Sequence, residues 1–270
     1  MNLVAADSLE LTALAALFNE GFSDYLLPMH LDVTALRDHV DGNDIDPTAS
    51  PVAVADRPVA FALLGRRGAE AWIGGMATVP AHRRRGLGER VMAAAIEAAA
   101  GQGCTDVWLE VIDGNAPAIA LYRRLGFEAV RDLVVWSLPA SRSQPPPARP
   151  ADVGTARAWI AANRADREPW QRADVTLERL RDRRAQMRAM VVERGGATAG
   201  AVVYRDEATV TILQAAAVDA RAAAEVLRAA TGSDRDARFG NTPSERPLAQ
   251  ALRELGASAL VRQHEMRLRL

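Results

Sequence analysis

The chain has 270 residues, 49% of them hydrophobic and 25% charged, a balance typical of a globular protein with room for two domains. Its formal net charge of -1 gives no general attraction to nucleic acid or to an anionic membrane. Cys104 is the single cysteine, which excludes an internal disulfide and a thiolate-based metal site. No uncharged apolar run reaches ~20 residues and no basic leader opens the chain. We therefore expect a cytoplasmic protein with no metal and no membrane span.

The first half alternates amphipathic segments with short apolar runs, which indicates an α/β sheet layered by helices. Apolar residues at three- and four-residue intervals predict the helices, and apolar runs bounded by turn residues predict the strands. In chain order we expect helices at Leu9–Glu20 and Asp32–Asp41, strands at Pro51–Ala55, Ala60–Gly65 and Trp72–Val79, a helix at Gly88–Ala100, a strand at Asp106–Val111, a helix at Ala116–Leu125 and a strand at Glu128–Leu138.

A proline-rich stretch, Pro139–Pro150, follows these elements. Its three consecutive prolines, Pro145–Pro147, lack amide donors and favour extended backbone, so the stretch is predicted to be a semi-rigid spacer. The predicted organisation is therefore a first domain over residues 1–138, a linker over 139–150 and a second domain over 151–270.

The second half repeats the same order of elements at similar spacing, which suggests a duplicated unit. We expect helices at Val153–Ala162 and Leu177–Met187, strands at Met190–Glu193, Gly200–Tyr204 and Thr209–Gln214, a helix at Ala222–Ala230, a strand at Ala237–Phe239, a helix at Pro247–Leu255 and a strand at Leu260–Leu270.

The segment before the predicted helix at Gly88–Ala100 carries two glycines, Gly86 and Gly88, after three arginines. Glycines let the backbone turn tightly and present its amides outward, and a helix amino terminus adds partial positive charge. Arg84 and Arg85 can add charge-assisted bonds. The pattern predicts a pyrophosphate-binding loop, although a solvated basic turn fits this segment alone equally well.

A second motif follows the predicted strand at Asp106–Val111. Its residues are Asn115, Ala118, Leu121, Tyr122, Leu125, Gly126 and Phe127. Taken together, the two motifs agree in order and separation with the GNAT superfamily of N-acetyltransferases, which the first half resembles. The resemblance implies acetyl-CoA as co-substrate and an α/β (α+β) chain of two tandem GNAT-like domains, each a mixed sheet flanked by helices. It rests on Arg83-x-x-Gly86-x-Gly88 and on the run Asn115, Ala118, Leu121, Tyr122, Leu125, Gly126 and Phe127.

Within that superfamily the chain is most similar to the branch that acetylates protein amino termini, including ribosomal-protein alanine acetyltransferases. Glu110, Asn115 and Tyr122 keep the separations of that branch's site residues. The resemblance implies a cofactor site in which main-chain groups hold the pantetheine arm, a loop holds the pyrophosphate and an asparagine binds the amide region. The residues implied for the pantetheine arm are Ala77, Thr78 and Val79. Those implied for the pyrophosphate are Arg84, Arg85, Gly86, Leu87, Gly88 and Glu89, and the asparagine is Asn115.

Acyl transfer to an amine needs a base, stabilisation of an oxyanion and protonation of the leaving thiolate. Glu110 is the candidate base, directly or through a water, and Tyr122 is the candidate acid. A main-chain amide between Ala77 and Val79 is the candidate oxyanion donor. Glu110 fits equally well as the outward residue of a half-buried strand, Tyr122 also suits simple helix packing, and Asn115 also suits a turn.

The acceptor side is less clearly encoded. Aromatic and apolar residues in and after the first helix are candidates for an apolar entrance, and core packing explains them equally well. The acidic stretch Asp41–Asp46 suits either attraction of a cationic amine or a solvated loop. The candidate substrate-binding residues are Phe22, Tyr25 and Met29, with Phe18 and Pro28 beside them.

The second half resembles the same fold faintly and is predicted to be degenerate. Alignment of Leu255-Gly256 on Leu125-Gly126 places Leu252 where Tyr122 stands. The segment Val218–Ala223 lacks both glycines and places Asp219 where phosphates would lie, which repels them. A supporting role is expected for this half: packing on the first domain, forming one wall of the acceptor cleft, or forming a homodimer.

The sequence thus predicts an acyltransferase that moves an acetyl group from acetyl-CoA to a primary amine. The acceptor is either a protein or peptide amino terminus or a small-molecule amine. The alternative from another class is a non-catalytic acyl-CoA-binding sensor or scaffold module.

Overall fold

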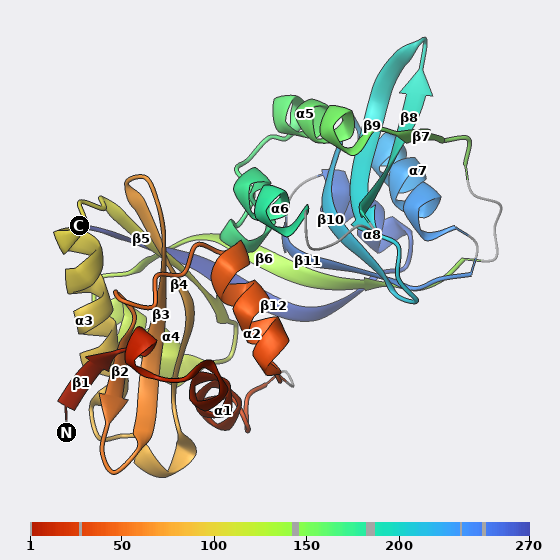
Figure 1. Cartoon of the computed structure of the whole chain (residues 1–270). Coiled ribbons are helices and arrows are strands. Elements are labelled where there is room, and N and C mark those ends of the chain that lie inside the picture. The colour runs from red at the N-terminus through yellow and green to blue at the C-terminus, as the bar shows by residue number, and fades with distance from the viewer. Residues whose placement is uncertain (1, 27–28, 142–145, 182–186, 233, 245–246) are drawn as a thin grey trace. The chain divides into compact units, whose positions relative to one another are not determined.

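A computed structural model of the chain describes residues 2–26, 29–141, 146–181, 187–232, 234–244 and 247–270. The chain folds as two compact units (Figure 1). The first contains Met1–Val130 together with His264–Leu270, and the second contains Arg131–Gln263. Two strands, β6 (Glu128–Leu138) and β12 (Ser258–Arg269), therefore each contribute residues to both units.

The first unit confirms the predicted series of helices and strands and adds a short strand at its beginning. That strand, β1, was not predicted because its four residues are defined by antiparallel pairing with a segment some fifty residues away, Asn2 with Val54. The strands are β1 (Asn2–Ala5), β2 (Pro51–Val54), β3 (Pro58–Arg67), β4 (Glu70–Thr78) and β5 (Asp106–Ile112); the helices are α1 (Leu11–Gly21), α2 (Val33–Gly42), α3 (Leu87–Gly101) and α4 (Ala116–Arg124), with 3-10 turns η1 (Ala6–Ser8) and η2 (Pro80–His82).

The central strands of the first unit separate from one another along part of their length. The sheet order is β1-β2-β3-β4-β5, with β12 following β5. β4 and β5 pair in parallel only from Glu70 with Asp106 to Trp72 with Trp108. Beyond Trp72, β4 continues to Thr78 while a bulge at Gly74 changes its register against β3. The two strands therefore open into a wedge at their carboxyl ends.

Helices cover both faces of this sheet. On one face Phe18 and Gly21 of α1 lie against Gly75 and Ala77 of β4. On the other face Gly88, in the first turn of α3, lies near the alternate residue Thr78. Because successive side chains of a strand point to opposite faces, α1 and α3 sandwich the same strand. The wedge thus has a helix on either side of its β4 wall.

The second unit repeats this arrangement. Its sheet order is β6-β11-β10-β9-β8-β7, and β10 and β11 pair in parallel only from Val210 with Ala237 to Ile212 with Phe239. A bulge at Leu213 follows, as one follows Trp72 in the first unit. The elements are β7 (Arg149–Ala151), β8 (Met187–Arg194), β9 (Ala197–Arg205), β10 (Val210–Ala217), β11 (Ala237–Pro243), α5 (Val153–Asn163), η3 (Trp170–Arg172), α6 (Asp174–Arg181), α7 (Ala220–Thr231) and α8 (Pro247–Glu254).

Two predicted boundaries in this region are wrong. The helix predicted at Leu177–Met187 is α6, which begins at Asp174, and Met187 already belongs to β8. The strand begins earlier than predicted because every second residue, through Ala189 and Val191, is buried against the core. The intervening residues 182–186 lie outside the described part of the chain. In the proline-rich stretch, residues 142–145 also lie outside it, and its last two residues open β7.

The two units have the same fold, an α/β mixed sheet with helices on its faces, as predicted. Cys104 is buried. Within the described residues, no helix combines the length and the apolar character that crossing a membrane requires.

Candidate active site

The predicted phosphate loop has the geometry of an anion-binding helix start. Gly86 caps α3 with a left-handed φ of 74°, and Arg84 also has a positive φ of 59°. The first α3 bond goes from the Arg90 amide to the Gly86 carbonyl, at 3.1 Å. Amides of the first helical turn have no intrahelical acceptor, so those that precede Arg90 are available to a ligand. The structure brings Arg84 to Glu89 together at one helix amino terminus.

Arg83, the first residue of the loop motif, makes internal contacts instead of lining the loop. Its guanidinium pairs with both carboxylate oxygens of Asp24, at 2.6 and 2.7 Å. It also donates to the carbonyl oxygens of Gly21, at 3.2 Å, and Thr78, at 3.0 Å. The side chain therefore ties the loop that follows α1 to the end of β4. Sequence reasoning missed this pair because its members are 59 residues apart.

The amides along the end of β4 alternate between the two neighbouring strands. The Val79 amide donates to the Val59 carbonyl at 2.9 Å, inside the sheet. Amides two residues apart on a strand point the same way, so the Ala77 amide also faces β3 and that of Thr78 faces the wedge. Among the three residues predicted to meet the pantetheine arm, Thr78 therefore has its amide on the open side.

Glu110 stands at the mouth of the wedge, two residues beyond the last parallel pair. Its Oε2 accepts a hydrogen bond from the Trp72 indole at 2.8 Å. A reciprocal bond runs from the Trp108 indole to Glu70 at 3.0 Å, so each strand's tryptophan holds the other strand's glutamate. Glu110 is half-buried, and its carboxylate has a fixed orientation before any ligand binds.

His39, on α2, lies on the same side as Trp72, with ring centroids 6.0 Å apart. Its Nε2 bonds to the carbonyl of the bulge residue Gly74 at 2.8 Å. Burial lowers the pKa of His39, and this bond opposes the shift. No sequence pattern points to His39, because its partner is 35 residues away along the chain.

Tyr122, Asn115 and Tyr25 form one cluster. Burial, with a smaller contribution from the neighbouring Tyr25 phenol, raises the pKa of Tyr122 far above its usual range. Burial also raises the pKa of Tyr25, while its hydrogen bonds with the Asn115 side chain and the Ile112 main chain oppose that shift. Asn115 in addition caps α4 by accepting from the Ala118 amide at 3.4 Å. Two predicted site residues, the cap of α4 and a residue within that helix, thus lie near a predicted acceptor-side residue from the loop after α1.

The other candidate acceptor residues divide between core and surface. Phe18 is buried in the core, and its ring stacks on Phe61 with centroids 5.7 Å apart. Phe22 is half-buried and touches the Tyr25 ring edge-on at 5.1 Å. Met29 is exposed, and Pro28 lies outside the described residues. The acidic stretch Asp41–Asp46 is partly used in local bonds, such as that from Arg67 to Asp44 at 2.7 Å.

The second unit keeps the wedge but not the phosphate loop. Residues 79–86 separate β4 from α3, whereas only Val218 and Asp219 separate β10 from α7. Asp219 caps α7 directly, with its carboxylate 2.7 Å from the Ala222 amide, so this helix start already holds an anion. The Ala257 amide bonds to the Leu252 carbonyl as the Phe127 amide bonds to Tyr122, which agrees with the alignment of Leu252 on Tyr122.

The first unit therefore combines a wedge between two parallel strands, a glycine-capped helix start that follows β4, and a half-buried carboxylate held by Trp72. Residues 12–127 match the profile of the acetyltransferase (GNAT) family. The match lies within the first unit and covers less than half of the chain.

Two curated relatives match parts of the chain. Streptothricin acetyltransferase of Streptomyces lavendulae is 36% identical over 96 residues, covering 33% of this chain and 49% of that protein. The ribosomal protein bS18-alanine N-acetyltransferase of Salmonella typhimurium is 42% identical over 72 residues, covering 27% of this chain and 49% of that protein. The chain thus spans about half the length of these relatives.

Solved structures match the whole chain in fold. A GCN5-related N-acetyltransferase from Sphaerobacter thermophilus has a TM-score of 0.74 at 17% identity, covering 99% of this chain and 95% of that one. A tandem GNAT protein from the clavulanic acid biosynthesis pathway has a TM-score of 0.68 at 16% identity, covering 99% and 98%. At this identity the likeness concerns the fold alone, and it agrees with the tandem arrangement of two GNAT-like units.

Proposed function

We propose that the first unit transfers the acetyl group of acetyl-CoA directly to a primary amine. The observation that carries this proposal is the wedge between β4 and β5, which has the Gly86-capped start of α3 on one side and Glu110 at its mouth. A diphosphate held at that helix start directs the attached thioester along β4. The Thr78 amide is proposed to face the thioester carbonyl, and the Tyr122 phenol is proposed to meet the thioester sulfur.

Glu110 takes a proton from the acceptor ammonium, directly or through a water, and the free amine then attacks the thioester carbon. The Thr78 amide stabilises the oxyanion that develops as the carbon–nitrogen bond forms. Tyr122 donates its phenolic proton to sulfur as the carbon–sulfur bond breaks. The nitrogen of the adduct then loses its second proton, which restores the Tyr122 phenol, and the proton held by Glu110 passes to solvent. The products are the acetamide and CoA thiol.

The remaining cofactor contacts are proposed from the family resemblance. Main-chain groups of Ala77, Thr78 and Val79 would hold the pantetheine arm, and the loop Arg84 to Glu89 would hold the pyrophosphate. Asn115 would bind the amide region of the cofactor. Its bond with Tyr25 supports a site in which the cofactor and acceptor sides meet.

The proposed acceptor is either a protein or peptide amino terminus or a small-molecule amine. The two curated relatives divide in the same way, since one name refers to streptothricin and the other to a ribosomal protein's alanine. Phe22, Tyr25 and Met29 would form the acceptor wall. Thiol release from acetyl-CoA should be measured with two sets of acceptors, alanine-starting peptides and small aliphatic amines. A non-catalytic sensor would bind acetyl-CoA but release no thiol with either set.

Glu110→Gln is expected to lower turnover about tenfold near neutral pH, because the amide cannot accept a proton. The loss should shrink as the pH approaches the pKa of the acceptor amine, where free amine is present without a base. The measurement is kcat against pH for both proteins. Glu70→Gln is the matched control, since Glu70 makes the reciprocal tryptophan bond away from the wedge mouth. Equal losses in both variants would remove the base from the mechanism.

Arg83→Met is expected to raise KM for the acceptor about threefold with little change in melting temperature. Its ion pair is half exposed and so contributes ~0–1 kcal/mol to stability, but it fixes the loop that carries Tyr25. The control is Arg57→Met, which removes an equally short exposed pair with Glu20. The measurement is the initial rate as a function of acceptor concentration, which gives KM for both variants. An unchanged KM in Arg83→Met would leave the Asp24 contact without a role in the site.

A further inference from the structure

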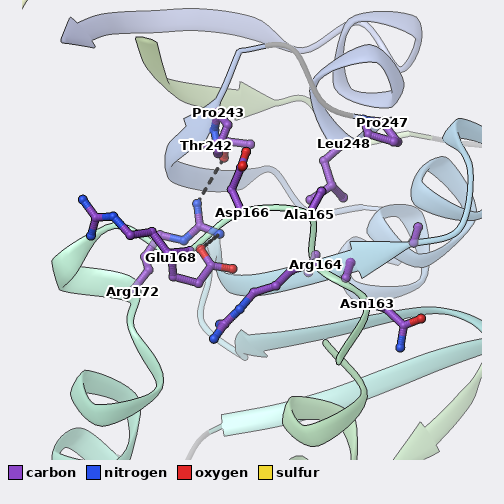
Figure 2. A pocket seen from close by; sticks show the side chains of 14 residues that line it. Asn163, Arg164, Ala165, Asp166, Glu168, Arg172, Thr242, Pro243, Pro247 and Leu248 are labelled. Carbon is purple, nitrogen blue, oxygen red and sulfur yellow. Dashed lines mark hydrogen bonds and ion pairs between the residues drawn. The ribbon is translucent and has the colours of Figure 1, made fainter. Parts of the chain in front are cut away.

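The second unit contains a cavity of about 90 Å³ where its own wedge opens (Figure 2). One water needs ~15 Å³ of such volume, so the cavity holds roughly six water-sized groups. The cavity therefore suits a small molecule. Its walls come from the ends of β10 and β11, the start of α8 and the loop after α5, and include Ala215–Ala217, Thr242, Pro243, Pro247, Leu248 and Asn163–Glu168.

The inner wall of the cavity is a buried ion pair. Glu168 and Arg172 are bonded at 2.8 Å, and their side chains are only 8% and 9% exposed. Arg172 also bridges the separated strands, since it donates to the carbonyl of the bulge residue Leu213 on β10, at 2.9 Å, and to that of Gly240 on β11, at 2.7 Å. It packs over the Phe239 ring at 4.3 Å. This network satisfies backbone groups that the wedge leaves without a strand partner.

Within the described residues, this ion pair keeps one hydrogen-bond acceptor and one hydrogen-bond donor that no other protein group uses. Glu168 Oε2 takes the bond from Arg172, and among the described residues no other donor reaches the carboxylate. A guanidinium has five N–H donors. In Arg172, Nε serves Leu213, Nη1 serves the carbonyls of Gly240 and Asn241 and the Thr242 hydroxyl, and one Nη2 hydrogen serves Glu168. A carboxylate oxygen and an N–H group therefore remain side by side at the cavity wall.

Three arginines and two carboxylates line the cavity, and Asp174 beside them brings the sum of charges to zero, which favours a neutral ligand. The lining charges are Arg164, Arg167, Arg172, Asp166 and Glu168. Glu168 is paired with Arg172, and Arg164, on the lining loop, is paired with Asp174 at 2.8 Å. Burial raises the pKa of Glu168, and the nearby arginines, Arg172 foremost, oppose that shift. An ammonium or a carboxylate ligand would add an uncompensated charge to this site, at a desolvation cost.

We propose that the second unit binds a small molecule that joins a primary amide to a compact apolar body. The amide N–H would donate to Glu168, and its carbonyl would accept from Arg172. The apolar body would lie against Ala215, Ala216 and Leu248. The site takes no diphosphate, because the two-residue turn before α7 offers no phosphate loop. It is therefore separate from the proposed acetyl-CoA site and is independent of whether the first unit is catalytic.

Three probes of similar shape test the chemistry: isobutyramide, isobutylamine and isobutyrate, each titrated into the full chain by ligand-observed NMR. Isobutyramide is expected to bind saturably with a Kd on the order of 1 mM, as suits so small a ligand. The amine and the carboxylate are expected to bind at least tenfold more weakly. Tightest binding by either charged probe would overturn the amide assignment, and no saturable binding by any probe would overturn the site.

Two variants test the location. Leu248→Trp fills the cavity without touching the ion pair and is expected to weaken isobutyramide binding at least tenfold. Its matched control is Leu260→Trp, at a leucine that is 45% exposed and outside the cavity, which should keep the affinity. Glu168→Gln should also weaken binding, with its fold checked by circular dichroism. Unchanged affinity in Leu248→Trp would place the probe elsewhere and overturn the proposal.

Discussion

Replacing Tyr122 with phenylalanine is expected to lower turnover about a hundredfold while the Kd for acetyl-CoA changes less than twofold. The substitution removes only a hydroxyl from a buried ring that packs against Phe127, with centroids 5.9 Å apart. Phenylalanine keeps that packing, so the loss reports the missing proton donor. General acid catalysis contributes ~10²–10⁴-fold in enzymes, and a thiolate is a good leaving group, which favours the lower end.

Because the pKa of Tyr122 is raised, we expect a second result from the same assay. A tyrosine with an ordinary pKa near ~10 would ionise at the alkaline end of a pH–rate profile and lose its function as an acid. Burial holds this phenol protonated, so kcat of the parent enzyme should show no alkaline fall from pH 8 to pH 10. Stopped-time thiol release checks both results, with circular dichroism to show that the variant is folded. Full turnover in Tyr122→Phe would leave the residue with a packing role only.

The features that the sequence predicted are those encoded by neighbouring residues. Gly86 and Gly126 have positive φ angles of 74° and 91°, which few other residues adopt, so their positions mark the helix start and the turn after α4. Asn115 caps α4 through a bond to the Ala118 amide, three residues away. A motif composed of such local signals is visible without a structure.

The features that the sequence could not predict depend on residues far apart in the chain. The Trp72 bond that orients Glu110 joins residues 38 positions apart, and nothing in either segment alone specifies it. Arg172, which bridges the second wedge, is 41 residues from its Leu213 partner. The C-terminal residues are a similar case. The Leu270 amide bonds to the Thr105 carbonyl at 2.9 Å, so the end of the chain completes the first unit.

Gly86→Asp is expected to weaken acetyl-CoA binding between tenfold and a hundredfold. The backbone at Gly86 is left-handed, and a Cβ added there would meet nothing within 4 Å, so space does not limit the substitution. Charge does. At ~5 Å from a phosphate oxygen, a carboxylate repels with about 1–3 kcal/mol for effective dielectric constants between 80 and 20. That range corresponds to roughly fivefold to over a hundredfold in Kd.

Gly86→Asn separates this repulsion from backbone strain, because asparagine has nearly the shape of aspartate and adopts a left-handed φ more readily than most residues. Its Kd for acetyl-CoA should stay within about threefold of the parent, whereas the aspartate variant should recover affinity as added salt screens the carboxylate. Isothermal titration calorimetry at two ionic strengths measures both effects. If asparagine and aspartate weaken binding equally, strain at the turn is responsible and no diphosphate lies beside it. If neither weakens binding, the cofactor does not use the amino terminus of α3, and the orientation of the thioester toward Tyr122 has no basis.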